Sequence, residues 1–361
     1  MSDVIHPFSI CDITRLGSIR GDLDHNSGPF CLGASASLFL IKVVLSNNMS
    51  GLVPVLIIGG SGGSSFCFDG RYNGATLKKI WVWVGGWQVK AIEIWLTDGE
   101  NQLFGQPEGE YYEFKFKDGE YISSLSLWGN GAGTRLGAIK FETSHSNKFF
   151  VYMTSWGLKT EYPVNVGSGI CLGVMGRSGA DIDSLGFIFI NDIKSSVLTN
   201  VNYPTLHQVT PQIATEEIKS LTYTNNSDLT QSFSVETSKT LFKKSSWSVT
   251  NKLEQNFNIQ VKAGIPNIVE FSAGFSLTMG VENRYELENS EEKKETFTFK
   301  VEILPRKTAL VHISIGRATV DLPYTGIVEV TCKNGDVLRF NTSGTYNGIL
   351  YTNSKATVTQ K

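Results

Sequence analysis

The stretch from Ser248 to Glu282 alternates between apolar and polar side chains, and this pattern constrains the fold more than any other feature of the sequence. Odd-numbered positions from Val249 to Val281 carry no Asp, Glu, Lys or Arg, whereas every charged residue of the stretch lies at an even position. Alternation with a period of two is typical of β-strands that have one apolar and one polar face. The stretch is therefore predicted to form two amphipathic strands.

The two arms are expected to meet in a turn near residues 264–266, because glycine tolerates positive φ and proline cannot continue a β-ladder. A three-residue loop there would pair Ala263 with Asn267 and Val261 with Val269, which places the odd residues of both arms on one face. Each arm would span about 50 Å, enough to cross a hydrocarbon core of about 30 Å even when tilted. The hairpin could simply cover a soluble core, but its length and segregated charges favour a stem that inserts into a membrane.

Such a stem cannot insert alone, because its outer edges would leave backbone N–H and C=O groups unpaired in lipid. Several copies that close a barrel are therefore expected, so the predicted partners are a target membrane and further copies of the chain. The side chains expected to face lipid are Val249, Leu253, Phe257, Ile259, Val261, Val269, Phe271, Phe275, Leu277, Met279 and Val281. Those expected to line the lumen are Lys252, Glu254, Lys262 and Glu270.

Composition narrows the function classes. A formal net charge of −2 and the absence of a dense basic stripe argue against nucleic-acid binding. The five cysteines are scattered and form no CxxC pair, which predicts free thiols and no metal site. The five histidines lie in unrelated contexts and no HExxH motif occurs, so we expect neither an enzyme nor a cofactor. The sequence contains no run of apolar residues long enough for a membrane helix. It also contains no convincing signal peptide.

These features predict a soluble protein, cytoplasmic or released by a route without a signal peptide, that becomes membrane-inserted when it assembles. Residues 1–52 show no alternation and are expected to be a poorly ordered N-terminal extension. Residues 53–190 contain short strands separated by glycine-rich turns, which is typical of one compact all-β domain. Residues 191–204 are polar and rich in turn formers, which predicts a linker, and residues 205–361 are expected to form a second, elongated β-domain.

A glycine-rich loop over residues 176–186 places Asp181 and Asp183 ahead of an apolar strand. A fixed carboxylate accepts hydrogen bonds from neighbouring sugar hydroxyls, and free backbone amides donate to them. A glycine turn with solvated aspartates explains the same residues equally well. The earlier loop over residues 59–63 lacks the Lys-Ser/Thr ending of a phosphate-binding P-loop, so that function is rejected.

Residues 53–190 resemble a jacalin-related lectin domain: IGGSGGSSFCF is similar to the opening glycine loop of that family, and GADID followed by SLG to its GxxxD sugar-binding motif. The resemblance implies a β-prism of three four-stranded sheets that binds mannose-containing glycans. Because Ala180 and Asp181 stand where other members often carry an aromatic residue, the resemblance leaves the sugar preference open. The implied glycan-binding residues are Gly60, Gly133, Thr134, Gly179, Ala180, Asp181, Ile182 and Asp183.

From about Pro204 onward, the stretches ATEEIKS, AGIP and GRATVDLPYTG resemble the pore-forming module of fish natterin-like, or aerolysin-like, proteins. In that family a soluble form binds a glycan, oligomerises and inserts a hairpin as a β-barrel, and the family places this hairpin at residues 248–282. The expected fold is thus an all-β chain with a jacalin-like prism, an elongated aerolysin-type domain and a long amphipathic insertion hairpin. The alternative function is a soluble mannose-binding lectin whose second domain is structural or dimerising.

Overall fold

A computed structural model describes residues 42–44, 50–250, 257–272 and 274–361. Every regular element in this part of the chain is a β-strand, which confirms the all-β prediction. Most of the expected N-terminal extension lies outside the described residues, as do Lys252, Leu253 and Glu254 of the expected stem. Within the described residues, no helix has the length and apolar character needed to cross a bilayer.

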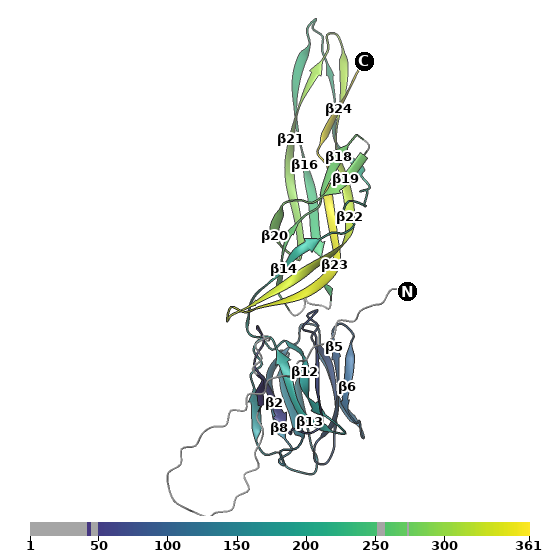
Figure 1. Cartoon of the computed structure of the whole chain (residues 1–361). Coiled ribbons are helices and arrows are strands. Elements are labelled where there is room, and N and C mark those ends of the chain that lie inside the picture. The colour runs from purple at the N-terminus through teal and green to yellow at the C-terminus, as the bar shows by residue number, and fades with distance from the viewer. Residues whose placement is uncertain (1–41, 45–49, 251–256, 273) are drawn as a thin grey trace, which may run out of the picture.

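The first domain is a prism of three antiparallel sheets packed around one core (Figure 1). The first sheet has the order β1 (Lys42–Val44), β2 (Val55–Gly59), β13 (Ile182–Phe189), β12 (Cys171–Ser178) and β3 (Ser64–Asp69). The second has the order β10 (Lys148–Tyr152), β9 (Leu136–Thr143), β8 (Ile122–Gly129) and β11 (Glu161–Val164). The third has the order β6 (Asn101–Gly105), β5 (Val89–Leu96), β4 (Leu77–Val84) and β7 (Tyr111–Lys115).

The core of the prism is built by the alternating side chains that the sequence displays in these strands. Ile80 and Val82 of β4 are fully buried, and so are Ile92 and Ile94 of β5. These aliphatic residues pack with aromatic side chains such as Phe141 from the neighbouring sheets. Burying one such side chain stabilises the fold by about 1.5–3 kcal/mol, so the three sheets hold one another in place.

The second domain is elongated and built around a nine-stranded sheet (Figure 1). Its strands are β14 (Ile193–Asn202), β15 (Ala214–Thr224), β16 (Gln231–Trp247), β17 (Ile259–Gly264), β20 (Glu282–Glu286), β21 (Glu288–Ile303), β22 (Thr308–Cys332), β23 (Val337–Tyr351) and β24 (Lys355–Gln360). The main path runs β20-β17-β14-β22-β23-β16-β21, while β15 and β24 pair with another part of β22. The 25-residue strand β22 thus connects both ends of the domain. Two further strands, β18 (Asn267–Phe271) and β19 (Gly274–Thr278), form a separate hairpin.

The predicted linker over residues 191–204 is wrong, because most of it is strand β14. This strand lies inside the nine-stranded sheet, where it pairs antiparallel with β22 and parallel with β17. Its composition is polar because one face points to solvent, but Leu198 on the other face is fully buried. The second domain therefore begins near Asp192, whose backbone carbonyl accepts a hydrogen bond from the N–H of Lys333.

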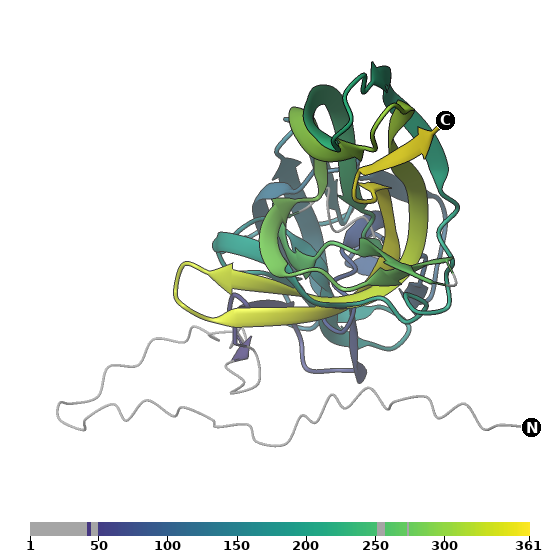
Figure 2. The same ribbon diagram turned by 90° about the horizontal axis from the view of Figure 1, so that it is seen from above.

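The two domains are stacked end to end, and the elongated domain lies above the prism (Figure 1; Figure 2). One hydrophobic cluster crosses the junction and contains Leu52 and Ile188 from the prism together with Val328 and Val330 from β22. Polar contacts add to it, since the backbone N–H of Gly51 donates to the Asp336 carboxylate at 3.0 Å. The domains thus share part of their core.

The predicted pairing of the two arms of residues 248–282 is also wrong. Val261 pairs with Tyr285 of β20 rather than with Val269, and Ala263 pairs with Asn283 rather than with Asn267. The other arm folds on itself, because β18 pairs with β19. The reason is that β17 has two better partners in its own sheet, β14 on one side and β20 on the other.

The faces of the alternating stretch follow the predicted parity in the first arm and diverge in the second. The buried odd residues of the stretch are Val249, Phe257, Ile259, Val261, Ala263 and Leu277. Val269 and Phe275 are half-buried. Phe271, Met279 and Val281 are exposed, with 58, 42 and 80% of their surface accessible. Among the described residues, the apolar face of the first arm is therefore part of the protein's own core, whereas that of the second arm is largely not.

The strands that flank this stretch form a long ribbon. β16 and β21 pair antiparallel from Gln231 opposite Ile303 to Ser246 opposite Glu288, without a shift in register. Val235 and Val301 face inward and are buried, whereas the outward-facing side chains are mostly Ser, Thr, Lys and Glu. Since residues 248–287 connect the two strands, the alternating stretch emerges from one end of this ribbon.

Candidate functional site: a carboxylate cluster at the far end of the prism

The predicted sugar-binding loops meet at the end of the prism that lies away from the second domain. Near the junction, the N–H of Val53 donates to the carbonyl of Phe189, whereas at the other ends of the same two strands the N–H of Gly60 donates to the carbonyl of Asp183. The loop over residues 130–135 reaches the same place, because a side-chain Cβ on Gly60 would collide with the Thr134 backbone. We call this end of the prism the distal end.

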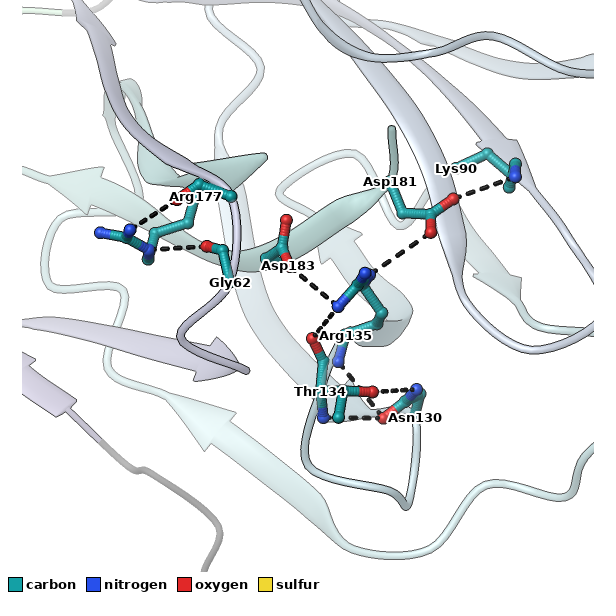
Figure 3. A network of polar contacts seen from close by, with 9 residues as sticks. Gly62, Lys90, Asn130, Thr134, Arg135, Arg177, Asp181 and Asp183 are labelled. Atoms are coloured by element: carbon teal, nitrogen blue, oxygen red, sulfur yellow. Dashed lines mark hydrogen bonds and ion pairs between the residues drawn. The ribbon is translucent and has the colours of Figure 1, made fainter. Parts of the chain in front are cut away.

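Asp183 is the most enclosed charged group of the site (Figure 3), with 2% of its surface accessible. Side chains on Gly62 or Gly63 would collide with its carboxylate, so glycine is required for the loop to close over it. Nη1 of Arg135 lies 2.9 Å from Oδ1 of Asp183, yet this buried oxygen has no well-aligned hydrogen bond among the described residues. Burial raises the pKa of the Asp183 carboxyl above its ordinary value of 3.8, against the opposing effect of the Arg135 charge.

Asp181 is less enclosed and is surrounded by cations. Nζ of Lys90 lies 3.0 Å from its Oδ1, and Nε of Arg135 lies 3.3 Å from its Oδ2. Burial by itself would raise the pKa of this carboxyl, but hydrogen bonds from Gln88 and Lys90 outweigh burial and hold the pKa below its ordinary value. Arg135 therefore bridges the two aspartates (Figure 3), and Asp181 is the more firmly ionised of the two.

Arg177 completes the network without contacting a carboxylate directly. Its guanidinium donates to the backbone carbonyls of Gly62 and Gly63, the first at 2.7 Å, and so fixes the opening glycine loop (Figure 3). Lys90 carries a second partner, since its Nζ lies 2.9 Å from the exposed carboxylate of Glu108. Three cations and three carboxylates thus share one small surface.

The structure brings all eight predicted glycan-binding residues to the distal end but gives them different roles. The N–H of Gly179 donates to the carbonyl of Asp181, and the carbonyl of Ala180 accepts from the N–H of Gln106, so these groups shape the loop. Ile182 has a fully buried side chain, while the Thr134 hydroxyl accepts a hydrogen bond from Asn130 of its own loop. Gly60 and Gly133 supply backbone only, Gly133 at a positive φ of 72°. Asp181 and Asp183 are the side chains able to accept hydrogen bonds from a ligand.

Sequence reasoning missed Gln88, Lys90, Arg135 and Arg177. None of them lies in the GxxxD motif, and the first two lie about ninety residues before it in the chain. Arg177 lies two residues before the motif, inside the predicted loop over residues 176–186, whereas only the closure of three sheets into a prism brings Gln88, Lys90 and Arg135 beside the aspartates. A pattern of isolated basic residues in β-rich sequence gives no local signal for such a cluster.

A three-sheet prism with a glycine-lined carboxylate site, joined to an elongated β-domain, defines a two-domain all-β protein of lectin type. The sequence profile of the jacalin-like lectin domain matches residues 55–188. The crystal structure of lamprey immune protein is 54% identical, covers 86% of this chain and 99% of that chain, and superimposes with a TM-score of 0.83. Natterin-1 of Thalassophryne nattereri is 23% identical over 239 residues. The matched region covers 65% of this chain and 66% of natterin-1, which is just short of two thirds of that protein.

The chain therefore belongs to the natterin-like, aerolysin-like family with an N-terminal jacalin-related lectin domain, the family of lamprey immune protein. Membership explains why the prism and the elongated domain occur together in this order. It also implies that the first domain is a carbohydrate-binding module.

Proposed function

We propose that this protein is a glycan-targeted, β-barrel pore-forming protein. The lectin domain binds mannose-containing glycans on a target membrane through Asp181 and Asp183. Several copies then assemble, and residues 248–282 leave their own domain and insert as part of a transmembrane β-barrel. Insertion requires no catalytic step and no cofactor, because the apolar side chains only exchange contacts with protein for contacts with lipid.

The glycan part of the proposal is supported by the chemistry of the distal end. Ionised carboxylates accept hydrogen bonds from vicinal hydroxyls, and Oδ1 of Asp183 has unused acceptor capacity. Lys90 and Arg135 beside them can donate to ring or hydroxyl oxygens. Mannose is the proposed sugar because the glycine loop is continuous with the rest of the chain, as in the mannose-type branch that the sequence resembles.

The main support for pore formation is that strand β17 has one apolar face and one polar face. Ile259, Val261 and Ala263 are buried, and the residues between them, Gln260 and Lys262, are exposed. The segment is connected at both ends to a ribbon that is already paired in register over 16 residue pairs. A strand with one fully apolar face can exchange its protein core for lipid, provided that sister chains pair with its edges. Glycan binding would favour this assembly by raising the local concentration.

The proposal is tested with liposomes that carry or lack mannosylated lipid and contain a self-quenching dye. The protein is expected to release the dye from mannosylated liposomes and to form oligomeric rings visible by electron microscopy. Discrete conductance steps are expected in a planar bilayer. Soluble mannose in excess should prevent all three by competing for the lectin site. Liposomes that stay sealed at saturating bound protein would contradict the proposal.

One observation favours a second function, that of a soluble lectin whose second domain is structural. Seven odd-numbered residues of the alternating stretch are packed in one hydrophobic cluster with β22 and β23, as they would be in a permanent core: Val249, Phe257, Ile259, Val261, Ala263, Ile265 and Leu277. This alternative predicts sugar binding and agglutination without conductance steps. The bilayer measurement therefore separates the two functions, while the competition by mannose is common to both.

A further inference from the structure

We infer that Trp87 and Trp156 form a second sugar subsite, which stacks on a saccharide unit adjacent to the one held by Asp181 and Asp183. This inference rests on the proposed glycan-binding function and extends it to a ligand class: a neutral oligosaccharide of at least two units. The indole rings are in edge-to-face contact, with centroids 4.8 Å apart and an interplanar angle of 86°. They remain 50 and 46% exposed, which is unusual for two tryptophans in contact with each other.

The loops that carry the two tryptophans are joined by backbone hydrogen bonds. The N–H of Thr154 donates to the carbonyl of Gly85, and the N–H of Ser155 donates to the carbonyl of Gly86. A side chain at Gly86 would be pushed into the Ser155 hydroxyl, so the two loops approach closely because this residue is glycine. The exposed rings are thus held in place by the loops, and little conformational entropy remains to be lost on binding.

The tryptophan pair lies beside the carboxylate cluster. Trp87 is followed directly by Gln88, whose side chain hydrogen-bonds Asp181. On the other side, the aliphatic part of the Lys159 side chain, three residues after Trp156, packs against Gly131 of the predicted glycan loop. Both tryptophans therefore lie in loops whose neighbouring residues contact the site, at the same end of the prism.

The chemistry of this surface fits a sugar better than a bilayer. The C–H groups on one face of a pyranose ring are apolar and pack on an indole ring, while the hydroxyls at its rim need polar partners such as Lys90, Asp181 and Glu108. A bilayer would require the same ionic groups to lose water, which is costly for charged side chains. Aromatic side chains flanked by a few polar groups are typical of small-ligand sites.

The test compares calorimetric affinities for methyl α-mannoside and for a mannose trisaccharide. In Trp87→Ala and Trp156→Ala variants of the full chain, the affinity for the trisaccharide should fall about tenfold, and that for the monosaccharide by no more than about twofold. Trp156→Phe, which keeps an aromatic ring, should retain most of the preference for the trisaccharide. Tyr72→Ala is the matched control, because Tyr72 is 73% exposed but follows the junction end of β3.

Equal loss of both affinities, or no loss, would overturn the subsite. The same holds if the variants keep the trisaccharide preference but lose binding to glycan-free phosphatidylcholine vesicles, since the pair would then be a bilayer anchor. Unchanged thermal unfolding of each variant separates these outcomes from misfolding. If the wild-type protein binds neither sugar, the proposed glycan-binding function fails first. The monosaccharide arm therefore tests that function, and the ratio of the two affinities tests the subsite.

Discussion

Phe271, Met279 and Val281 show at the residue scale that the apolar face of the alternating stretch is not fully buried in this structure. They lie on the apolar face of the stretch and yet are 58, 42 and 80% exposed to solvent. Side chains this exposed contribute little to the core. In an inserted hairpin the same side chains would be covered by lipid. A polar replacement would therefore disfavour insertion without destabilising the fold seen here.

A Phe271→Asp substitution is therefore expected to change the free energy of unfolding of the soluble protein by no more than about 0.5 kcal/mol. It should nevertheless abolish dye release from mannosylated liposomes, because a carboxylate would face hydrocarbon. Chemical denaturation and leakage measured on one preparation test both parts. Phe257 is not a suitable position for this test, because it is 3% exposed and packs near Phe340. A charge at that position would unfold the domain. Full leakage by the Phe271→Asp protein would count against insertion of β18.

Mannose binding is expected to weaken at acidic pH because of Asp183. Burial raises the pKa of this carboxyl above 3.8, so it gains a proton at a higher pH than an exposed aspartate and then no longer accepts two hydroxyls. The sign for stability is the opposite: the folded state binds the proton more tightly, so this group stabilises the fold below its unfolded pKa and loses that contribution as the pH rises through its folded pKa.

Calorimetric affinity for mannose, measured as the pH is lowered from 7, checks this prediction. In an Asp183→Asn variant the remaining affinity should no longer vary with pH in the same range. An unchanged profile in that variant would assign the pH dependence to another group.

The aspartates were predicted from their glycine-rich surroundings, because the loop chemistry is local in sequence. Arg135 and Lys90 were not, since their relation to Asp181 depends on how three sheets close. In the sequence, both residues are indistinguishable from ordinary solvated cations. Their contacts with Asp181 become apparent only in the folded prism, where the loops of the distal end meet. Local motifs thus predict which loop binds, and the tertiary fold decides which charges modulate it.

At the scale of elements, the β16–β21 ribbon fixes a register that the alternating stretch can inherit. Partners in this ribbon have residue numbers that add to a constant, as in Lys239 opposite Glu295. Continued into the stretch, the same register centres the turn on Asn267 and pairs Lys262 with Ser272. The register predicted from the turn residues alone pairs Lys262 with Ile268 instead. Both put the odd residues on one face, so parity cannot choose between them.

Paired cysteines distinguish the two registers. A Lys262→Cys/Ser272→Cys protein is expected to form a disulfide once it is inserted in mannosylated liposomes, because directly paired strand residues match disulfide geometry. A Lys262→Cys/Ile268→Cys protein serves as the matched control and should stay reduced. Mass spectrometry of oxidised, liposome-bound protein reads out both. The reverse pattern would mean that the ribbon does not extend into the barrel in register.

Alternation in the sequence predicted the buried face of β17 correctly but not the partners of this strand. Ile259 and Val261 are buried as expected, yet β17 pairs with β14 and β20. Alternation with a period of two shows which side chains share a face. Strand pairing, in contrast, depends on segments far away in the chain. The strand β14 itself escaped prediction, because its polar face and turn-forming residues resemble a linker.

At the scale of the whole molecule, the two domains share hydrophobic residues, so the boundary between them matters for any fragment. A fragment of residues 191–361 retains β14 in the centre of its sheet, whereas a fragment of residues 205–361 lacks it. Loss of β14 removes the strand between β17 and β22 and exposes fully buried side chains such as Val328. We expect the longer fragment to unfold cooperatively and the shorter one to be largely unfolded, as measured by circular dichroism during heating. Equal stability would contradict the central role of β14.

Under the proposed function, residues 248–282 must leave the position they occupy in this structure before the protein can open a membrane. Gln260 of β17 lies directly opposite Glu286 of β20, and both side chains are exposed. Cysteines at these two positions are expected to form a disulfide that locks β17 in its sheet. Either cysteine alone is the control.

The most direct measurement is therefore dye release from mannosylated liposomes by the Gln260→Cys/Glu286→Cys protein, first oxidised and then reduced on the same liposomes. We predict that the oxidised protein binds the liposomes but leaves them sealed, and that reduction starts release at the rate of the single-cysteine controls. Release by the fully oxidised protein at the control rate would contradict the claim.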